Sequence, residues 1–210
     1  GLTSVTIPNT VTSIGRGAFR NCTNLMTSVS IPAYVTYLGD NPFAGCNLTS
    51  ITVDPDNAYY DSRDGCNAII GTADNVLITG CVNTVIPDNV ASIGNYAFYR
   101  CTGLTSITIP SSVTSIGNHA FYYCNSLTSV SIPASVTTIG KYAFSYCTGL
   151  TSITIPNSVT SIEEQAFYYC NSLSTVTIPA SVLNIGNYAF GGCTGLTEMT
   201  VEATTPPTLG

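Results

Sequence analysis

Side chains that could support acid–base or nucleophilic chemistry are few and scattered in this sequence. His119 is the single histidine, and equivalent segments carry tyrosine or glutamine at its position, which favours an exposed spacer residue over a catalytic one. Glu163 and Glu164 are adjacent near an expected helix start, where negative charge is favourable. An active site needs titratable groups that converge on one point. Because no such set is visible, the sequence predicts a protein that is not an enzyme and has no cofactor.

One acidic cluster could bind a cation. It consists of Asp54, Asp56, Asp61 and Asp64. Their spacing does not match the calcium loop of an EF-hand. The Asp-Pro-Asp-Asn segment is typical of turns, in which aspartate side chains accept hydrogen bonds from the nearby backbone. Turn formation is therefore the favoured interpretation, and we predict no metal site.

Nine cysteines could form disulfides or bind metal, but their spacing favours another role. Seven of them occupy one position of a repeat: Cys22, Cys46, Cys101, Cys124, Cys147, Cys170 and Cys193. We expect these to stack as a ladder of buried thiols, which pack as small apolar groups. Their parallel Cα–Cβ bonds would suit a disulfide poorly. Cys66 and Cys81 flank an expected hairpin, where either a cross-strand disulfide or two packed thiols would fit.

The element that must position all these residues is the repeat itself. From Leu104 to Gly195, one unit of 23 residues occurs four times, starting at Leu104, Leu127, Leu150 and Leu173. A constant period in the range of about 20–50 residues is typical of a solenoid, in which each unit is one coil stacked on the next. The period thus predicts an elongated stack of coils.

Within the unit that starts at Leu150, the apolar positions predict two strands. Ile153 and Ile155 alternate with a threonine, as in a half-buried strand that Pro156 ends. Val159 and Ile162 then supply a short second strand rich in β-branched residues. Stacked coils should pair the first strands into a continuous parallel sheet.

The end of each unit predicts a turn and a short helical segment. A glycine such as Gly117 or Gly140 usually follows the second strand and suits a turn with positive φ, although Glu163 takes this place in one unit, so positive φ is not obligatory there. In the next segment, Ala-Phe-x-x-Cys, the spacing places Phe144 and Cys147 on one face of a short helical turn. The predicted fold is therefore a repeat solenoid of β/α coils with a parallel sheet, short second strands and short helical turns.

We expect one solenoid domain over residues 1–210. Its coils are 2–24, 25–47, an enlarged coil 48–81, 82–103, 104–126, 127–149, 150–172, 173–195 and a partial coil 196–210. The enlarged coil carries two apolar runs, Asn67–Ile70 and Val76–Thr79, and the polar segment Gly71–Asn75 between them predicts a hairpin insertion. Because the first and last coils lack the polar caps of complete arrays, we expect a fragment of a longer array.

The composition excludes two classes of partner. Charged residues make up 8% of the chain, with 5 Lys and Arg against 11 Asp and Glu, for a net charge of −6. Such a balance offers no basic patch for a phosphate backbone, so we expect no nucleic-acid binding. No apolar run approaches the roughly 20 residues that span a bilayer, so we expect no membrane insertion. We expect a monomer.

Two repeated surfaces are candidates for binding. The strand face carries hydroxyl columns of Ser106, Thr108, Ser129, Ser131, Ser152, Thr154, Thr175 and Thr177. These side chains could contact a partner, although threonine also favours exposed strand positions for its own sake. The other surface is a stripe of tyrosines beside the inward phenylalanines, with Tyr99, Tyr122, Tyr123, Tyr142, Tyr146, Tyr168 and Tyr169 as candidate binding residues and Tyr96 and Tyr188 at its ends.

Tyrosine is enriched at protein interfaces because it combines apolar area with a polar tip at low entropic cost. The alternative is that the tyrosines pack between coils and only their hydroxyl groups reach water. If the chain has a binding surface, the tyrosine stripe is the first place to look.

The unit from Leu104 to Cys124, Leu-x-x-Ile-x-Ile-Pro-x-x-Val-x-x-Ile-Gly-x-x-Ala-Phe-x-x-Cys, resembles the BspA-like class of leucine-rich repeats. The resemblance covers nearly the whole chain. The irregular segment from Tyr60 to Pro87 is similar to an insertion seen in gut-bacterial members. The resemblance implies an exported or surface-attached bacterial protein, and in some members binding to extracellular-matrix proteins or other cells. It implies no catalytic residues.

These observations predict a non-catalytic protein-binding or adhesion module that recognises an extracellular protein or glycan. The alternatives are a carbohydrate-binding accessory region, in which the tyrosine stripe stacks on sugar rings, and a structural spacer within a larger surface protein. We expect an extracellular or cell-surface location, with any signal or anchor outside this chain.

Overall fold

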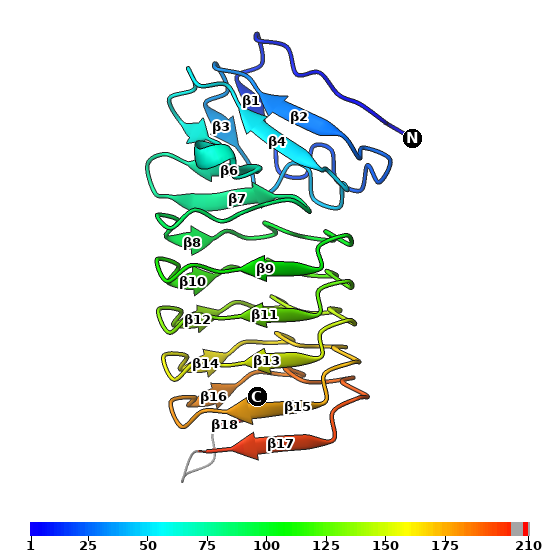
Figure 1. The fold of residues 1–210 in the computed structure, drawn as a ribbon, viewed down its shortest axis with the longest axis vertical. Coiled ribbons are helices and arrows are strands. Elements are labelled where there is room, and N and C mark those ends of the chain that lie inside the picture. The colour runs from blue at the N-terminus through cyan, green and yellow to red at the C-terminus, as the bar shows by residue number, and fades with distance from the viewer. Residues whose placement is uncertain (203–207, 210) are drawn as a thin grey trace.

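The computed structural model describes residues 1–202 and the strand Thr208–Leu209. The described chain winds into stacked coils that follow one another from the N-terminal to the C-terminal end of the sequence (Figure 1). The predicted solenoid is therefore confirmed. No helix in the described part of the chain is long and apolar enough to cross a bilayer.

Seven of the coils contain a longer strand, and these strands lie on one side of the stack. These strands are β2 (Ser28–Ile31), β4 (Ser50–Val53), β9 (Ser106–Thr108), β11 (Ser129–Ser131), β13 (Ser152–Thr154), β15 (Thr175–Ile178) and β17 (Glu198–Val201). A parallel sheet in the order β17-β15-β13-β11-β9 covers the C-terminal coils, and β2 pairs with β4 in a separate parallel sheet. In the five-stranded sheet Ser129 pairs with Ser152, 23 residues on, so the register equals the sequence period.

The predicted second strands form another side of the stack. They are β1 (Ser13–Ile14), β3 (Tyr37–Leu38), β8 (Ser92–Ile93), β10 (Ser115–Ile116), β12 (Thr138–Ile139), β14 (Ser161–Ile162), β16 (Asn184–Ile185) and β18 (Thr208–Leu209). Strand β18 pairs with β16, so the expected partial coil 196–210 contributes a second strand; residues 203–207 and 210 of this coil lie outside the described residues.

The enlarged coil contains the predicted hairpin. Strands β6 (Ala68–Gly71) and β7 (Val76–Gly80) pair antiparallel, and the residues between them form the loop. The structure adds two elements to the prediction, strand β5 (Tyr60–Asp61), which pairs antiparallel with β6, and the short 3-10 turn η1 (Arg63–Gly65). Because β7 also pairs parallel with β8, the insertion extends the sheet of second strands to nine strands.

The hairpin separates two hydrophobic cores. Ala68 and Ile70 pack into the core of the C-terminal coils, whereas Ile69 between them packs into the core of the N-terminal coils. Side chains alternate between the two faces of a strand, so β6 is buried on both of its faces. The insertion is thus a partition inside the solenoid.

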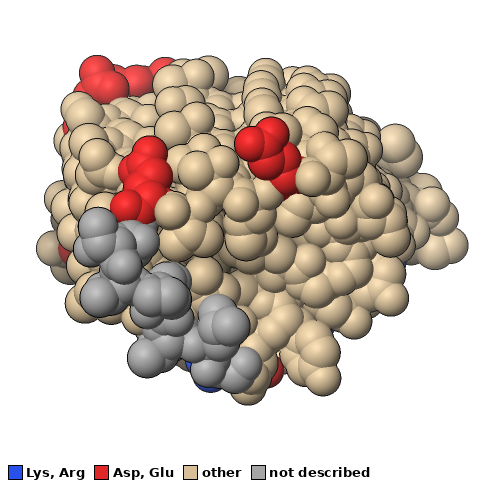
Figure 2. All heavy atoms as spheres, turned by 90° about the horizontal axis from the view of Figure 1, so that it is seen from below, with Lys and Arg blue, Asp and Glu red and all other residues tan. Residues whose placement is uncertain are grey.

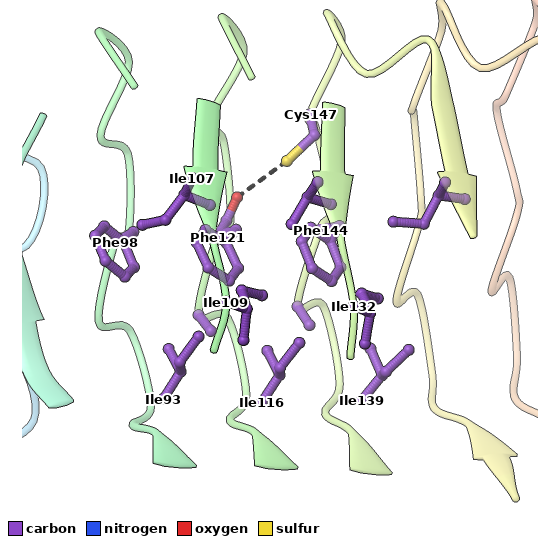
Figure 3. Packing of buried hydrophobic residues seen from close by; sticks show 14 of the residues in the cluster. Ile93, Phe98, Ile107, Ile109, Ile116, Phe121, Ile132, Ile139, Phe144 and Cys147 are labelled. Carbon is purple, nitrogen blue, oxygen red and sulfur yellow. Dashed lines mark hydrogen bonds between the residues drawn. The ribbon is translucent and has the colours of Figure 1, made fainter. Parts of the chain in front are cut away.

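The C-terminal core is built from equivalent residues of successive coils (Figure 3). The rings of Phe98, Phe121, Phe144, Phe167 and Phe190 stack in one column, with centroids 5.0–5.4 Å apart. The Phe19 and Phe43 rings form a separate stack in the N-terminal coils. At Gly80 the chain passes directly over the Phe98 ring, since a Cβ atom at this position would overlap it. The backbone of β7 therefore covers the end of the longer phenylalanine column.

The predicted helical turns were wrong. The Ala-Phe-x-x-Cys segments form consecutive tight turns, because residues on either side of each phenylalanine, such as His119 and Tyr123, have positive φ. His119, Phe121 and Tyr123 donate their N–H groups to carbonyls of the following coil over 2.7–2.9 Å. A helix would use these donors internally. The Phe–Cys spacing suits both conformations, so the spacing alone did not distinguish them.

The role predicted for the glycine after each second strand was also wrong. Positive φ occurs two residues later, at His119 rather than at Gly117. Glycine is favoured at Gly117 because a Cβ atom there would lie 2.7 Å from the carbonyl carbon of Gly94 in the preceding coil. This glycine therefore allows close stacking of the coils.

All nine cysteines are free thiols. The expected ladder forms, although Cys22 and Cys193 are only partly buried. Five of its seven thiols donate hydrogen bonds to phenylalanine carbonyls of the preceding coil, as from Cys147 to Phe121 over 3.1 Å (Figure 3). Cys66 and Cys81 do not form a disulfide, because Cys66 packs in the C-terminal core and Cys81 in the N-terminal core, on opposite sides of the partition. Burial raises the pKa of both of these thiols.

Candidate functional site

The tight turns place their outward side chains in three columns that cross the coils. The first column contains Tyr96, His119, Tyr142, Gln165 and Tyr188; the second contains Tyr99, Tyr122, Ser145, Tyr168 and Gly191; the third contains Arg100, Tyr123, Tyr146, Tyr169 and Gly192. Each column takes one residue from each of the five coils between residues 82 and 195. The residues of the predicted tyrosine stripe therefore lie in these ordered columns.

The backbone holds these side chains in a conformation that is unusual for bulky residues. Residues of the first and third columns, such as Tyr142 and Tyr146, have φ near 60°. This left-handed conformation costs about 1–2 kcal/mol for a residue with a Cβ atom. The hydrogen bonds between coils offset the cost, since Tyr142 donates its N–H to the Glu164 carbonyl and Tyr146 to that of Tyr168. The turns are therefore fixed by stacking.

A groove of about 370 Å³ runs between the first and second columns. We call it the aromatic groove. It is lined by Arg20, Tyr96, Tyr99, His119, Tyr122, Tyr142, Tyr146, Gln165 and Tyr168. The second column has a gap at Ser145, which is small and buried. Tyr146 of the third column packs across this gap and contacts the Tyr122 and Tyr168 rings edge-on, with centroids 5.6 and 5.8 Å away.

Most ring faces in the groove are covered by other rings. His119 lies between Tyr96 and Tyr142, with centroid distances of 4.7 and 4.6 Å and nearly parallel planes. Tyr99 stacks on Tyr122 at 5.1 Å. The groove therefore presents ring edges and hydroxyl groups to a ligand more than open ring faces.

Arginine side chains lie over one end of the columns. The Arg16 guanidinium lies 4.6 Å from the Tyr96 ring centroid, and that of Arg20 lies 4.5 Å from the Tyr99 centroid and donates a 2.7 Å hydrogen bond to the Tyr99 hydroxyl. Both arginines belong to the first coil and reach across coil 25–47. Coil 25–47 carries the small residue Ala44 at the position of Arg20 and Asp40 at the position of Arg16, so Arg20 has open space towards Tyr99.

The electrostatics of the groove follow from burial and from these arginines. Burial lowers the pKa of His119 below its ordinary value of 6.5, and the nearby positive charges of Arg16 and Arg20 lower it further. The neutral imidazole is therefore favoured. Burial also raises the pKa of Tyr122.

The structure brings Tyr99, Tyr122, Tyr142, Tyr146 and Tyr168 of the predicted stripe together in the groove. Tyr123 and Tyr169 lie in the third column, outside the groove lining. The sequence pattern placed Tyr96 only at an end of the stripe, and Arg20, His119 and Gln165 were not predicted to belong to the site. His119 and Gln165 could have been assigned because they share a repeat position with tyrosines. Arg20 could not, because its contact with Tyr99 skips two coils in the sequence.

The predicted hydroxyl columns of the strand face are all exposed and in register. None of the eight hydroxyl groups has a hydrogen-bond partner within the described chain. A groove of about 410 Å³ adjoins this face where coil 82–103 lacks a longer strand, between Val85 and Thr108. Seen from the C-terminal end, the surface is mostly uncharged, and its acidic side chains lie apart (Figure 2).

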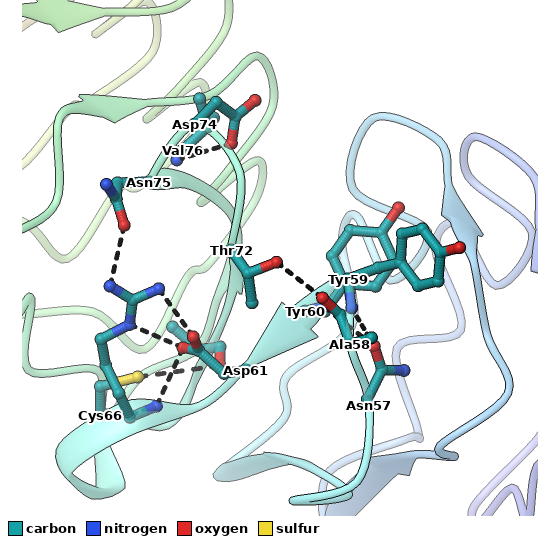
Figure 4. Close-up of polar contacts among 12 residues, drawn as sticks. Asn57, Ala58, Tyr59, Tyr60, Asp61, Cys66, Thr72, Asp74, Asn75 and Val76 are labelled. Atoms are coloured by element: carbon teal, nitrogen blue, oxygen red, sulfur yellow. Dashed lines mark hydrogen bonds and ion pairs between the residues drawn. The ribbon is translucent and has the colours of Figure 1, made fainter.

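The acidic cluster forms turns, as favoured by the sequence. The Asp54 carboxylate accepts a hydrogen bond from the Asp56 N–H over 3.0 Å. Asp61 pairs with Arg63 at 2.7 Å, and Arg63 also donates to the Asn75 side chain over 2.8 Å (Figure 4). Among the described residues, no three His, Cys, Asp or Glu side chains are grouped so that they could hold a metal ion.

Glu163 and Glu164 lie at no helix start. The Glu164 carboxylate pairs with Lys141 at 3.3 Å and accepts a 3.1 Å hydrogen bond from the Tyr142 hydroxyl. Glu163 accepts a 2.8 Å hydrogen bond from the Ser161 hydroxyl. These carboxylates therefore link side chains of neighbouring coils and of the second strand.

The fold is shared with solved structures of bacterial proteins. A leucine-rich cell surface protein from Faecalibacterium prausnitzii is 34% identical, with a TM-score of 0.86 over 97% of this chain and 54% of that one. A leucine-rich repeat protein from Bacteroides ovatus is 28% identical, with a TM-score of 0.59 over 90% of this chain and 40% of that one. The pneumococcal vaccine antigen PcpA is 24% identical over 90% of this chain and 42% of its own, and its TM-score of 0.66 shows a shared fold.

The chain thus spans about half or less of the length of these proteins. No curated protein matches the sequence significantly. The model of the BspA-type leucine-rich repeat region matches six copies, over residues 1–63 and 79–200. The unmatched segment contains strand β6 and the first part of strand β7 of the hairpin that divides the two cores. The chain therefore belongs to the BspA-type leucine-rich repeat family.

Proposed function

We propose that this chain is a non-catalytic protein-binding module of the adhesion type. It acts outside a bacterial cell and binds its partner through the aromatic groove. The location is supported by the similarity to a leucine-rich cell surface protein. The binding role is supported by the family and by the groove. We favour the groove over the strand face because the strand face offers only hydroxyl groups on an open sheet.

The observation that carries this proposal is the pre-ordered set of tyrosines in the groove. Tyrosine and arginine dominate the energetics of many protein interfaces. A side chain that is already fixed loses little entropy on binding. The groove side chains are held by their neighbours, as shown by the stacking of Tyr99 on Tyr122. The groove can therefore bind a partner at low entropic cost.

The same stacking favours a protein over a glycan as the partner. Sugar rings pack their apolar faces on open aromatic faces, and in this groove the faces of Tyr96, His119 and Tyr142 cover one another. A polypeptide can instead use the ring edges and the hydroxyl groups, which donate and accept hydrogen bonds. The experiment below distinguishes this proposal from the glycan-binding and spacer alternatives.

The test is a binding screen of the purified chain against extracellular-matrix proteins and a glycan array. The first variant, Tyr122→Ser/Tyr168→Ser, removes two rings of the groove. The matched control, Thr108→Ala/Thr154→Ala, removes two exposed hydroxyl groups of the strand face. Circular dichroism and thermal unfolding establish that each variant is folded.

The proposal predicts saturable binding to a protein that the tyrosine variant loses and the threonine variant retains. Loss in the threonine variant alone would place binding on the strand face. Selective binding to glycans would contradict the proposed partner class. The absence of saturable binding by a folded chain would contradict the proposal and favour the spacer.

A further inference from the structure

The few positive charges of this chain are concentrated beside the aromatic groove. The chain has 5 Lys and Arg against 11 Asp and Glu. Three of the five, Arg16, Arg20 and Arg100, lie over tyrosine rings of the columns, with Arg100 5.0 Å from the Tyr123 centroid. One end of the groove is therefore positive in a protein whose net charge is −6.

These three arginines have no acidic partner in the described chain. The ion pairs found there join Arg63 to Asp61 and Lys141 to Glu164, so the two cations far from this end are neutralised. A guanidinium carries five N–H donors, arranged to meet a carboxylate with two parallel hydrogen bonds. Arg20 uses one donor on Tyr99, and the described chain accepts none from Arg16 or Arg100. Donors suited to carboxylates are thus available at the groove.

Packing holds the arginines at one place although they come from different coils. Coil 25–47 lies between them and bonds to both neighbours, since Asn21 donates its N–H to the Ala44 carbonyl and Gly45 donates to that of Tyr99. Arg16 and Arg20 are exposed on either side of the position of the small Ala44 side chain, and Arg100 is half-buried. The positive end is a fixed part of the surface.

The two ends of the groove differ in charge. The far end is formed by Gln165 and Tyr168, with the Lys141–Glu164 pair beside it, so no free positive charge lies there. Four turns line the groove between these ends. At a strand spacing of roughly 4.8 Å, the first and the last of these turns are about 15 Å apart. An extended peptide covers that distance with about five residues.

We propose that the groove binds an extended acidic segment of a partner protein, with its carboxylates at the Arg16, Arg20 and Arg100 end. This inference rests on the proposed protein-binding function and names the chemistry of the partner. Charge complementarity selects an acidic segment, and the covered ring faces select a peptide over a sugar. The arginines supply carboxylate recognition, and the tyrosine edges and hydroxyl groups contact the peptide backbone.

The test measures fluorescence anisotropy of a labelled peptide in which glutamate alternates with alanine over about eight residues, enough to exceed the groove. An otherwise identical peptide with glutamine in place of glutamate is the uncharged control. Variants are Arg20→Gln and the triple variant Arg16→Gln/Arg20→Gln/Arg100→Gln. Lys141→Gln is the matched control, because it removes one positive charge that already has an acidic partner.

The expected result is saturable binding of the glutamate peptide to the unmodified chain. The glutamine peptide should bind at least about 10-fold more weakly, and so should the glutamate peptide to the triple variant, because charge-assisted contacts are lost in both cases. Arg20→Gln weakens binding, and Lys141→Gln changes it less than about 2-fold, since exposed ion pairs contribute little. Binding also weakens with added salt, which screens exposed charges.

Equal binding of the two peptides, or equal binding by the triple variant and the unmodified chain, would overturn the inference. A uronic-acid oligosaccharide, added as a competitor, would overturn it by binding more tightly than the peptide in an arginine-dependent way. A protein from the screen that binds through Tyr122 and Tyr168 but ignores the arginine substitutions would also overturn it, while leaving the proposed function in place.

Discussion

The regular array of residues 104–195 and the N-terminal region of residues 2–81 are stabilised by different kinds of contact. In the array, equivalent residues stack on one another, as in the phenylalanine column and the thiol ladder. The N-terminal region also contains the Phe19–Phe43 stack, but there single buried polar side chains connect segments that have no repeat relation. The periodic sequence therefore specifies its own register, whereas the irregular region depends on individual hydrogen bonds.

Asn41 and Asn57 are the clearest examples of such side chains. Asn41 is buried and donates to the carbonyls of Tyr96 and Ala97 at 2.7 and 3.0 Å. It also accepts hydrogen bonds from the Phe43 N–H and the Thr79 hydroxyl. Asn41 therefore joins the N-terminal coils to coil 82–103 across the inserted hairpin.

Asn57 connects the loop after β4 to the preceding coil in the same way. Its amide donates to the carbonyls of Pro32 and Val35, and its side-chain oxygen accepts from the N–H groups of Tyr59 and Tyr60. All four hydrogen-bonding positions of this buried amide are used. The aromatic groove depends on both regions, because the array supplies most of its tyrosines and the N-terminal region supplies Arg20.

The largest effect is expected inside the array. Phe144→Ala should lower the free energy of unfolding by about 3–5 kcal/mol, as for other fully buried phenylalanines. Phe19→Ala should cost clearly less, because Phe19 is only partly buried at the N-terminal end. Denaturant unfolding measures both values. Equal losses would contradict the view that stacking within the array dominates its stability.

A second prediction concerns the polar link between the regions. Asn41→Ala should lower the free energy of unfolding by about 3 kcal/mol, since it leaves several buried donors and acceptors without partners. The matched control is Asn157→Ala, at an exposed position of the array, which should change stability by less than about 0.5 kcal/mol. A small effect at Asn41, measured in the same unfolding experiment, would show that the hairpin alone joins the two regions.

A third prediction tests the partition at its closest contact. Gly80→Ala should destabilise the fold by about 1–3 kcal/mol, because the added methyl group must displace the Phe98 ring. Gly15→Ala is the control, since a Cβ atom there has no neighbour within 4 Å. Thermal unfolding of the two variants gives the comparison. Similar melting temperatures would mean that the Phe98 ring moves freely and does not pack against β7.

The smallest effect is expected for the pH dependence of stability that arises from His119, a groove residue of the array. The pKa of His119 is lowered in the folded chain, chiefly by burial and then by Arg16 and Arg20. The unfolded chain therefore binds the proton first as pH falls below 6.5. Stability should be complete above this pH and should decline as the pH falls towards the lower folded value. His119→Gln should remove this decline in urea unfolding measured across that range, and an unchanged slope would contradict it.

The sequence predicted the periodic parts of the molecule well, since the repeated positions of Ile153, Phe167 and Cys170 already imply a shared core face. The hairpin was also predicted, from its two apolar runs. The helical turns were wrong because the backbone donors of His119 and Tyr123 bond to another coil, and a pattern within one unit holds no information on that coil.

The candidate site was predicted only in part for the same reason. The tyrosines share a repeat period and could be grouped from the sequence. The reach of Arg20 to Tyr99 depends on the insertion, which places the turns of coils 25–47 and 82–103 next to each other. No local pattern predicts such a contact.

The most direct test of a binding site at the aromatic groove is a hydroxyl-radical footprint of the chain, alone and bound to the protein found in the screen. Tyr122, Tyr146 and Tyr168 line the groove, whereas Tyr34 and Tyr37 are exposed on the N-terminal coils and serve as internal controls. Binding in the groove predicts that the partner protects the first three from oxidation and leaves the other two unchanged. Protection of Tyr34 and Tyr37, with none at Tyr122, Tyr146 and Tyr168, would contradict it.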